Sequence, residues 1–293
     1  MNLDAYLRET SKDIDAALNQ FLPGAKTKPA TIHEAMRYSV FAGGKRLRPV
    51  LCLAAAEACG GDSTMALRAA CAVECIHTYS LIHDDLPCMD DDDLRRGRPT
   101  AHKVFGEGLA VLAGDALLTI AFEILADVQP VRNYPVSEFI RVLAVAAGSR
   151  FLIAGQVADL EAEGAPSTRQ ALRFIHERKT AALIEASLAL GAMSVNAKST
   201  KRDALVVFGR KLGLAFQIID DILDVTQPTE KLGKSAGKDV AAYKATYPSV
   251  IGLDASRRAA RKVTAEALCA LDPFGRSGDR LREIADYLLS REF

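Results

Sequence analysis

Two clusters of aspartates, each set in an apolar stretch with helical periodicity, constrain this chain more than any other feature. The first reads HDDLPCMD over residues 83–90 and continues with three more aspartates at residues 91–93. The second reads QIIDDILD over residues 217–224. Asp220 and Asp224 lie one helical turn apart, where like charges repel by roughly 0.2–0.5 kcal/mol per pair. A helix gains nothing from this spacing unless a cation binds to it.

The residues around both clusters argue against a solvated acidic face, because Ile, Leu, Phe and Tyr dominate them. Ionised carboxylates in apolar surroundings are costly unless they are paired or bind a metal. Oxygen ligands without nearby sets of His or Cys favour Mg²⁺ over zinc, and Mg²⁺ usually completes its coordination with water and substrate phosphates. Each cluster alone leaves the solvated face as an alternative. The two together favour a metal and diphosphate site.

The composition limits the classes of partner and compartment. Lys plus Arg equals Asp plus Glu, at 37 each, so no overall charge draws the chain to nucleic acid or to an acidic membrane. Six cysteines without a CxxC pair predict reduced, mostly buried thiols. Residues 1–20 lack the apolar core of a secretory signal. The apolar stretch from Leu109 to Leu125 is interrupted by Asp115 and Glu123, which predicts a buried helix and no membrane span. We therefore expect a cytoplasmic protein.

The chain has a helical pattern throughout, with short breaks at Gly, Pro, Ser and Asn. No linker is long enough to divide its 293 residues, and no extended alternating pattern indicates a sheet. The sequence therefore predicts a single all-α domain of packed helices. We expect helices near residues 3–20, 31–41, 48–59, 63–85, 101–127, 136–162, 168–195, 200–225, 239–252, 255–271 and 279–290.

Two basic motifs could bind phosphate. GGKRLRP at residues 43–49 combines glycines that allow close backbone approach with side chains that grip oxygen, although an ordinary Gly-terminated helix would read the same way. LRRGRPT at residues 94–100 follows the first acidic cluster. It could be a self-neutralising surface loop, or it could bind the diphosphate oxygens that a bridging Mg²⁺ leaves free.

Three further features are weaker. His77 lies two helical turns before Asp84 on nearly the same face, where a structural histidine is the alternative. Lys179 and Thr180 lie within a helical stretch, where a solvated lysine and a back-bonded threonine are the alternative. GKSAGKD at residues 233–239 has no preceding strand and lacks the Walker spacing, which excludes a P-loop NTPase.

Taken together, these motifs resemble the trans-isoprenyl diphosphate synthase family, and most closely its bacterial-type farnesyl diphosphate synthases. The resemblance covers nearly the whole chain and adds GQVADL at 155–160 and KATYP at 244–248 to the motifs above. It implies that residues 1–293 form a single polyprenyl synthetase domain, an all-α bundle of about ten or more helices around a deep central substrate cavity. It also implies a homodimer that depends on Mg²⁺, with three ions once substrate is bound and Mn²⁺ as the alternative metal.

The resemblance assigns a role to each matching position. It implies Mg²⁺ ligands at Asp84, Asp90 and Asp220, with Asp85, Asp221 and Asp224 as supporting catalytic acids. The allylic diphosphate or its reacting carbon would contact Arg95, Lys179, Thr180, Gln217 and Lys234, of which Lys179, Thr180 and Gln217 also belong to the catalytic set. Isopentenyl diphosphate would contact Lys45, Arg48, His77 and Arg96. Cys88, within the first motif, should not bind Mg²⁺.

The implied activity is the head-to-tail condensation of isopentenyl diphosphate with dimethylallyl or geranyl diphosphate. Bond cleavage would give an allylic cation that the isopentenyl double bond attacks, with the proton passing to the departed diphosphate. Such a geranyltranstransferase gives farnesyl diphosphate, and a geranylgeranyl diphosphate synthase is the alternative. A terpene cyclase or a non-catalytic synthase subunit is disfavoured, because the second DDxxD motif and residues 43–49 are both intact.

Product length should depend on the helix that carries Asp84. Tyr79 lies five residues before Asp84, about 7.5 Å along a helix axis, whereas Ser80 lies closer to the position beneath Asp84 by helical phase. A routine core aromatic is the alternative for Tyr79. The resemblance makes an aromatic at this position, together with Pro87 and Cys88 in the first motif, the mark of a cavity floor that stops growth at fifteen carbons. We therefore expect a farnesyl product.

Overall fold

The computed structural model describes residues 2–164, 168–226 and 246–289, and it confirms the all-α class. The predicted site residue Lys234 and the first half of the expected helix at 239–252 lie outside the described residues. The helices are α1 (Leu3–Phe21), α2 (Ala30–Val40), α3 (Leu47–Ala58), η1 (Ser63–Ala66), α4 (Leu67–Asp84), α5 (Ala101–Phe105), α6 (Glu107–Ala126), α7 (Val136–Ala147), α8 (Leu152–Glu161), α9 (Arg169–His176), η2 (Glu177–Ala181), α10 (Ala182–Ser194), α11 (Ser199–Thr226), α14 (Tyr247–Ile251), α15 (Leu253–Cys269), η3 (Asp272–Gly278) and α16 (Asp279–Leu289).

Helix α10 forms the centre of the bundle, because every residue in it except Glu185 is buried. It contacts α3, α4, α7 and α11. Ser187 and Ser194 satisfy their buried hydroxyls by donating to the carbonyls of Leu183 and Leu190. A Cβ at Gly191 would lie 1.9 Å from the Cys52 carbonyl, so only glycine allows α3 to pack this closely.

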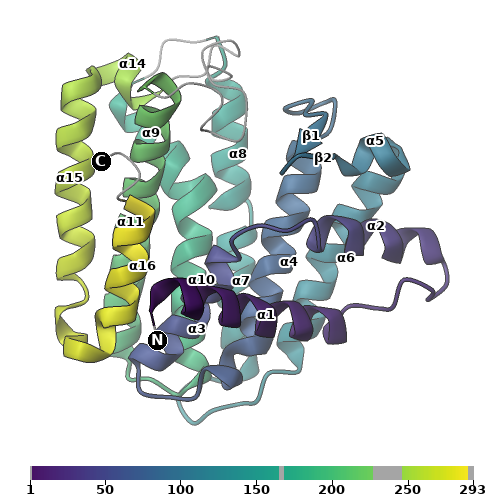
Figure 1. Cartoon of the computed structure of the whole chain (residues 1–293), viewed down its shortest axis with the longest axis horizontal. Coiled ribbons are helices and arrows are strands. Elements are labelled where there is room, and N and C mark those ends of the chain that lie inside the picture. Colours follow the sequence, from purple (N-terminus) through teal and green to yellow (C-terminus); the bar gives the residue numbers. More distant parts are fainter. Residues whose placement is uncertain (1, 165–167, 227–245, 290–293) are drawn as a thin grey trace.

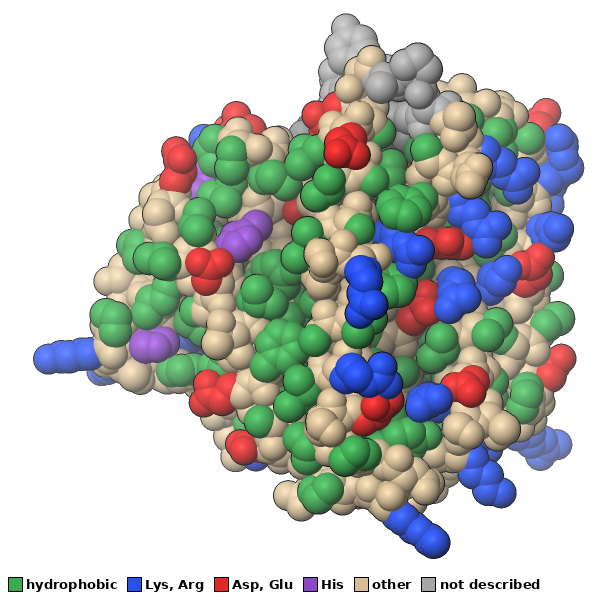
Figure 2. All heavy atoms as spheres, turned by 180° about the vertical axis from the view of Figure 1, so that it is seen from behind, with side chains coloured by type: hydrophobic (Ala, Val, Ile, Leu, Met, Phe, Trp, Pro, Cys, Tyr) green, Lys and Arg blue, Asp and Glu red, His purple; other side chains and the backbone are tan. Residues whose placement is uncertain are grey.

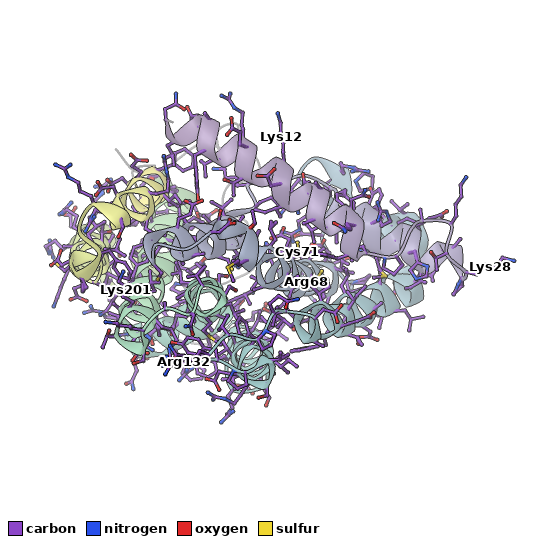
Figure 3. All side chains as sticks on the ribbon, turned by 90° about the horizontal axis from the view of Figure 1, so that it is seen from below. Lys12, Lys28, Arg68, Cys71, Arg132 and Lys201 are labelled. Atoms are coloured by element: carbon purple, nitrogen blue, oxygen red, sulfur yellow. The ribbon has the colours of Figure 1, made fainter. Side chains whose placement is uncertain are left out.

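The long helices α4, α6, α10 and α11 run in roughly the same direction, and α1 lies across the lower part of the bundle (Figure 1). Figure 3 looks along the bundle and shows Cys71 in the interior beneath α1, whereas Lys12 and Lys28 point outward. All six cysteines are described and free, and three of them are buried: Cys52, Cys71 and Cys75. The expectation of reduced thiols is met, although Cys88 and Cys269 are exposed.

Glycines divide two of the expected long helices. The expected helix at 101–127 is broken at Gly106, which has a φ of 85°, and the expected helix at 136–162 is broken after Gly148. Helix α6, which follows Gly106, is long and apolar enough to cross a membrane by length and composition alone. It packs along α4 and α2, and 44% of its most apolar window is buried inside the protein. A helix that packs this way is consistent with the predicted core helix.

A small β-ribbon follows the first acidic cluster and was not expected. Strand β1 (Leu94–Arg95) pairs antiparallel with β2 (Arg98–Pro99). The two residues between the strands, Arg96 and Gly97, have φ values of 55° and 75°. Two positive φ values are typical of the tight hairpin turns that match strand twist. The ribbon turns Arg95 back toward the end of α4, whereas Arg96 reaches the Gly43 carbonyl and Arg98 lies over the Tyr38 ring of α2.

Candidate active site

The first acidic motif begins at the carboxyl end of α4, where Asp84 is the last helical residue and Asp85 the C-cap. The chain then curls back on the helix end. The amide of Asp90 donates to the Asp84 carbonyl at 2.9 Å, and the amide of Asp92 donates to the Asp85 carbonyl at 3.2 Å. This local turn brings Asp84 and Asp90, the two predicted metal ligands of the motif, close to each other.

Asp84 lies where an ionised carboxylate is costly. Burial, with the neighbouring charges of Asp90 and Asp85, raises its pKa to about 6, while Lys179 and Arg95 oppose the shift. Lys179 is 95 positions away in the sequence, so its effect on Asp84 shows that the two segments approach each other in space. A divalent cation beside Asp84 and Asp90 would relieve this cost.

Asp85 differs from Asp84 because a side chain already neutralises it. Arg95, on β1, donates its Nε to Asp85 Oδ1 at 2.9 Å, and its Nη2 contacts both Asp85 and Asp92. Burial raises the pKa of Asp85, and Arg95 opposes that shift. Arg95, predicted to hold the allylic diphosphate, therefore binds the acidic motif itself in this structure.

The second motif lies within α11, near the end of that helix, and its three acids have different surroundings. Asp220 is partly exposed, whereas Asp221 and Asp224 are buried. Asp221 Oδ2 accepts from His176 Nε2 at 3.1 Å and from the Tyr247 amide at 2.9 Å. Asp224 Oδ2 is buried without a hydrogen-bond partner among the described residues. Asp221 therefore holds α9 and α14 to the motif, and Asp224 offers an oxygen that could accept a contact.

Lys179 and Thr180 lie in η2, a turn of π-helix that interrupts the α9–α10 segment. Such bulges are frequent at functional sites. Lys179 Nζ donates to Asp159 Oδ2 of α8 at 2.7 Å. A Cβ at Gly155 would lie 2.2 Å from the Lys179 amide nitrogen, so glycine in the GQVADL motif is what allows α8 to approach this turn. Because η2 also contacts α11, the turn places Lys179 and Thr180 beside the helix that carries Gln217, which is partly exposed.

Of the four residues predicted to bind isopentenyl diphosphate, Arg48, His77 and Arg96 form a basic cluster, and Lys45 lies on the loop before α3. Arg48 Nη1 lies 3.2 Å from His77 Nε2, and Arg96 Nη1 donates to the Gly43 carbonyl. Burial lowers the pKa of Arg48 to about 10, and burial next to Arg48 and Arg96 lowers the pKa of His77 well below its ordinary value. Lys45 is exposed and lies 5.3 Å from the centre of the Tyr287 ring. The structure therefore brings Arg48, His77 and Arg96 together, whereas the Lys45 side chain lies against the Tyr287 ring of α16.

Tyr79 and Ser80, the predicted chain-length residues, lie on different faces of α4. The Tyr79 ring is buried and meets the His83 ring edge to face, with ring centres 5.8 Å apart. His83 hydrogen-bonds the Val111 carbonyl of α6, and a Cβ at Gly114 would lie 2.1 Å from its Nε2. The Tyr79 hydroxyl is buried without a partner among the described residues. Ser80 donates to the His77 carbonyl at 2.9 Å and is a small residue one turn before Asp84.

Several residues of the site escaped the sequence analysis. Asp159 lies in the GQVADL motif, which carried a signal, but its pairing with Lys179 depends on the π-helical turn. His176 is 45 positions from its partner Asp221, and no local pattern marks it. His102 also adds a nitrogen near the first motif, with ligand atoms of Asp91, Asp93 and His102 within 4.8 Å of one another. Lys103 pairs with Asp93 there at 2.7 Å, which already supplies one positive charge.

Known proteins resemble this chain over nearly its whole length. It matches the Polyprenyl synthetase family model over residues 29–276. It is 50% identical over 300 residues to the heterodimeric geranylgeranyl pyrophosphate synthase large subunit 1, chloroplastic, of Arabidopsis thaliana, covering 98% of this chain and 79% of that protein. Among solved structures, an FPP/GFPP synthase from Zymomonas mobilis matches with a TM-score of 0.87 and 39% identity, covering 98% of this chain and 99% of that one.

A geranyltransferase from Helicobacter pylori, complexed with magnesium and isoprenyl diphosphate, matches with a TM-score of 0.83 and 35% identity, covering 99% of this chain and 97% of that one. The chain therefore belongs to the polyprenyl synthetase family, as its motifs predicted. It is a prenyltransferase of the trans-isoprenyl diphosphate synthase class, which joins prenyl diphosphates head to tail.

These comparisons correct one expectation. The prediction of a cytoplasmic location is contradicted, because the similar plant proteins are named as chloroplastic enzymes. The prediction used reduced cysteines and the lack of an apolar leader in residues 1–20. Those features distinguish reducing compartments from the secretory pathway, but they do not distinguish one reducing compartment from another.

Proposed function

We propose that the protein is a Mg²⁺-dependent geranylgeranyl diphosphate synthase that adds isopentenyl diphosphate to allylic diphosphates within one polyprenyl synthetase domain. The main observation in support of the active site is that three segments distant in the sequence, η2, α8 and the end of α4, approach one another. Lys179 in η2 pairs with Asp159 in α8 and acts on Asp84 at the end of α4. A lysine between two groups of acids is a natural contact for a diphosphate that metal ions bring to those acids.

The acidic side chains fit Mg²⁺ by their chemistry. Asp84, Asp90 and Asp220 would hold the ions, with the free oxygen of the buried Asp224 as further support. Hard oxygen donors favour a small divalent cation, and a pKa of about 6 leaves the Asp84 carboxylate mostly ionised at neutral pH and able to bind one. When bound, Mg²⁺ would offset the charge of the leaving diphosphate. Three ions, with Mn²⁺ as the alternative metal, remain part of this proposal.

The chain's own residues would then divide the remaining work. Lys179 would bind the allylic diphosphate by exchanging part of its contact with Asp159, and Lys234 and Arg95 would contact the same group. Thr180 and Gln217 would face the allylic carbon with their polar atoms, which stabilise positive charge without reacting with it. The departed diphosphate would accept the proton at the end of the reaction, so that no side-chain base is needed.

The basic cluster would bind isopentenyl diphosphate. His77 is neutral at physiological pH because its pKa is well below the ordinary value, so the positive charge beside it comes from the arginines, chiefly Arg48 and Arg96. A site that has cations but few nearby acids binds a diphosphate directly. This property separates it from the metal-dependent allylic side.

The length of the product rests on different support. Several similar plant proteins are named geranylgeranyl pyrophosphate synthases, which favours a twenty-carbon product. Ser80, one turn before Asp84, is a small residue, and a small side chain at this position would not block a longer chain. Farnesyl diphosphate is the second candidate, and the buried ring of Tyr79 on the same helix is the observation that favours it.

The test is a product analysis of the purified protein with labelled isopentenyl diphosphate and dimethylallyl diphosphate. We expect a Mg²⁺-dependent product that elutes as geranylgeraniol after dephosphorylation. A product that stops at fifteen carbons would support the second candidate. A cyclic product, or one without label from isopentenyl diphosphate, would contradict the prenyltransferase mechanism.

We further propose that two copies of the chain associate. Exposed Val104, Val111 and Leu112 extend from α5 onto α6. Figure 2 shows that this half of the molecule has many apolar side chains, scattered acidic ones and few Lys or Arg, whereas Lys and Arg gather on the opposite half. A large apolar area of this kind is typical of homodimer interfaces. Light scattering after gel filtration should give twice the monomer mass, and Leu112→Glu should lower it to that of one chain.

A further inference from the structure

Arg46 lies between Lys45 and Arg48 in the GGKRLRP motif, yet it does not face the basic cluster. Its side chain is 4% exposed, whereas Lys45 is exposed. The guanidinium makes three contacts inside the protein. It donates to Glu74 of α4 at 2.7 Å, to Asp15 of α1 at 2.9 Å and to the Val40 carbonyl of α2 at 2.6 Å. A single side chain thus joins the loop to three helices.

The backbone of this loop needs such support. Gly43, Gly44 and Arg46 have φ values of 88°, 120° and 46°, in the left-handed region that side chains other than glycine adopt rarely. Arg46 is also the N-cap of α3, and Arg48 lies in the first turn of that helix. The direction in which α3 begins therefore determines where Arg48 lies relative to His77, and the loop before it determines where Lys45 lies.

Glu74 connects the buried contact to the charge of the cluster. It is 2% exposed, and its charge acts on Arg48 and on Arg96 as well as on Arg46. It is thus the buried counter-charge beneath three arginines, of which only Arg46 bonds to it directly. Without that bond, neither the position of the loop nor the balance of charge in the cluster would be fixed.

We propose that Arg46 is the positioning residue for the isopentenyl diphosphate site: its buried contacts with Glu74, Asp15 and Val40 fix the start of α3 and so hold Arg48 beside His77 in the geometry that binds the diphosphate. This inference rests on the proposed function, which assigns the basic cluster to that substrate. It assigns to Arg46 no contact with the substrate. A displacement of about 1 Å in such a site can cost about a hundredfold in rate.

Two substitutions separate the side chain from the backbone. Arg46→Gly keeps the left-handed conformation without strain but removes the guanidinium, and Arg46→Lys keeps the charge but loses the planar fork. Both should raise the KM for isopentenyl diphosphate about ten- to hundredfold, with the KM for the allylic diphosphate within about twofold of wild type. Arg210→Lys is the control for the arginine-to-lysine change. It alters a half-exposed arginine that pairs with Glu185 between α11 and α10, and it should change neither constant.

Asp15→Asn provides a milder variant if the Arg46 variants fold poorly. The Asp15 side chain is 48% exposed, so its loss should leave the fold intact while raising the KM for isopentenyl diphosphate severalfold. Titration calorimetry of isopentenyl diphosphate should show the same order of affinities without turnover. Equal rises in both KM values, a fall in kcat alone, or normal affinity in the Arg46 variants would overturn the positioning role. A wild type that binds isopentenyl diphosphate but forms no elongated product would instead contradict the proposed function.

Discussion

The two aspartate motifs have similar sequences, but different contacts fix their conformations. In the first, a turn within ten residues brings Asp90 back to Asp84, and the half-exposed Arg95 neutralises Asp85. In the second, a continuous helix sets the spacing, and the buried His176 and the Tyr247 amide hold Asp221. In both, the second aspartate of the pair has a partner that fixes the motif, and the first is the predicted ligand. The first motif depends on its own loop, and the second depends on the packing of the bundle.

The largest effect should come from the predicted metal ligands, where the two motifs should behave alike. Asp84→Asn and Asp220→Asn each remove a charge that would position Mg²⁺ against the leaving diphosphate. We expect each to lower turnover about a thousandfold or more with an unchanged helical circular dichroism spectrum. Rates measured at saturating Mg²⁺ would check this. Full activity in either variant, or in wild type with excess EDTA, would contradict the metal assignment.

Removing the side-chain partner of Asp221 and that of Asp85 should change the free energy of unfolding by different amounts. His176→Ala leaves the buried Asp221 without its side-chain partner and should lower the free energy of unfolding by about 1–3 kcal/mol. Arg95→Ala should cost about 1 kcal/mol or less, because water can reach the place of this half-exposed side chain. Urea unfolding would measure both. Equal losses of stability would contradict the difference between a loop-held and a core-held motif.

The metal-free protein should be destabilised by its own active site. The pKa of Asp84 is raised from an ordinary 3.8 to about 6, so the folded state binds this proton more tightly than the unfolded chain. In EDTA, this group should make the stability of the wild type fall as pH rises from about 4 to about 6 and stay low above that range. Asp84→Asn lacks the fall and should be more stable at pH 7.5 by about 1–2 kcal/mol. An Asn variant less stable than wild type in EDTA would contradict this expectation.

The smallest effect on free energy should come from substitutions in α4, the helix that leads to the first motif. These should change the length of the product. Tyr79→Ala removes a buried ring and should lengthen the product by at least one isoprene unit, since each added buried CH₂ contributes about 0.8 kcal/mol. Ser80→Phe should shorten the product by placing bulk beneath Asp84. Chromatography of the dephosphorylated products decides both. If only Ser80→Phe alters the length, Tyr79 is a core aromatic and not a boundary of the cavity.

Much of this organisation follows from local sequence. The helical class and most helix positions could be predicted because the apolar periodicity is long and unbroken. The breaks at Gly106 and Gly148 were missed, since a single glycine within an apolar run does not reveal whether its φ is positive. The hairpin at residues 94–99 was missed because two-residue strands leave no alternating pattern.

The active site divides in the same way. The turn that joins Asp84 to Asp90 lies within one motif, so a sequence pattern can mark both residues. His176 and Asp159 are placed by packing between helices and by the π-helical turn, which no local pattern specifies. Arg46 illustrates a third case. It lies in a recognised motif, but its side chain is buried against Glu74 while Arg48 of the same motif contacts His77, and only the structure reveals that difference.

The most direct test of the central claim, that both motifs act on one diphosphate through shared Mg²⁺ ions, is a double-mutant cycle of Asp84→Asn and Asp220→Asn. Turnover of the two single variants and of the double variant would be measured at saturating Mg²⁺ and substrate. If the motifs act as one unit, the turnover of the double variant should be no more than about tenfold below that of the less active single variant. Losses that multiply would contradict the account, because they would mean that the two motifs contribute independently.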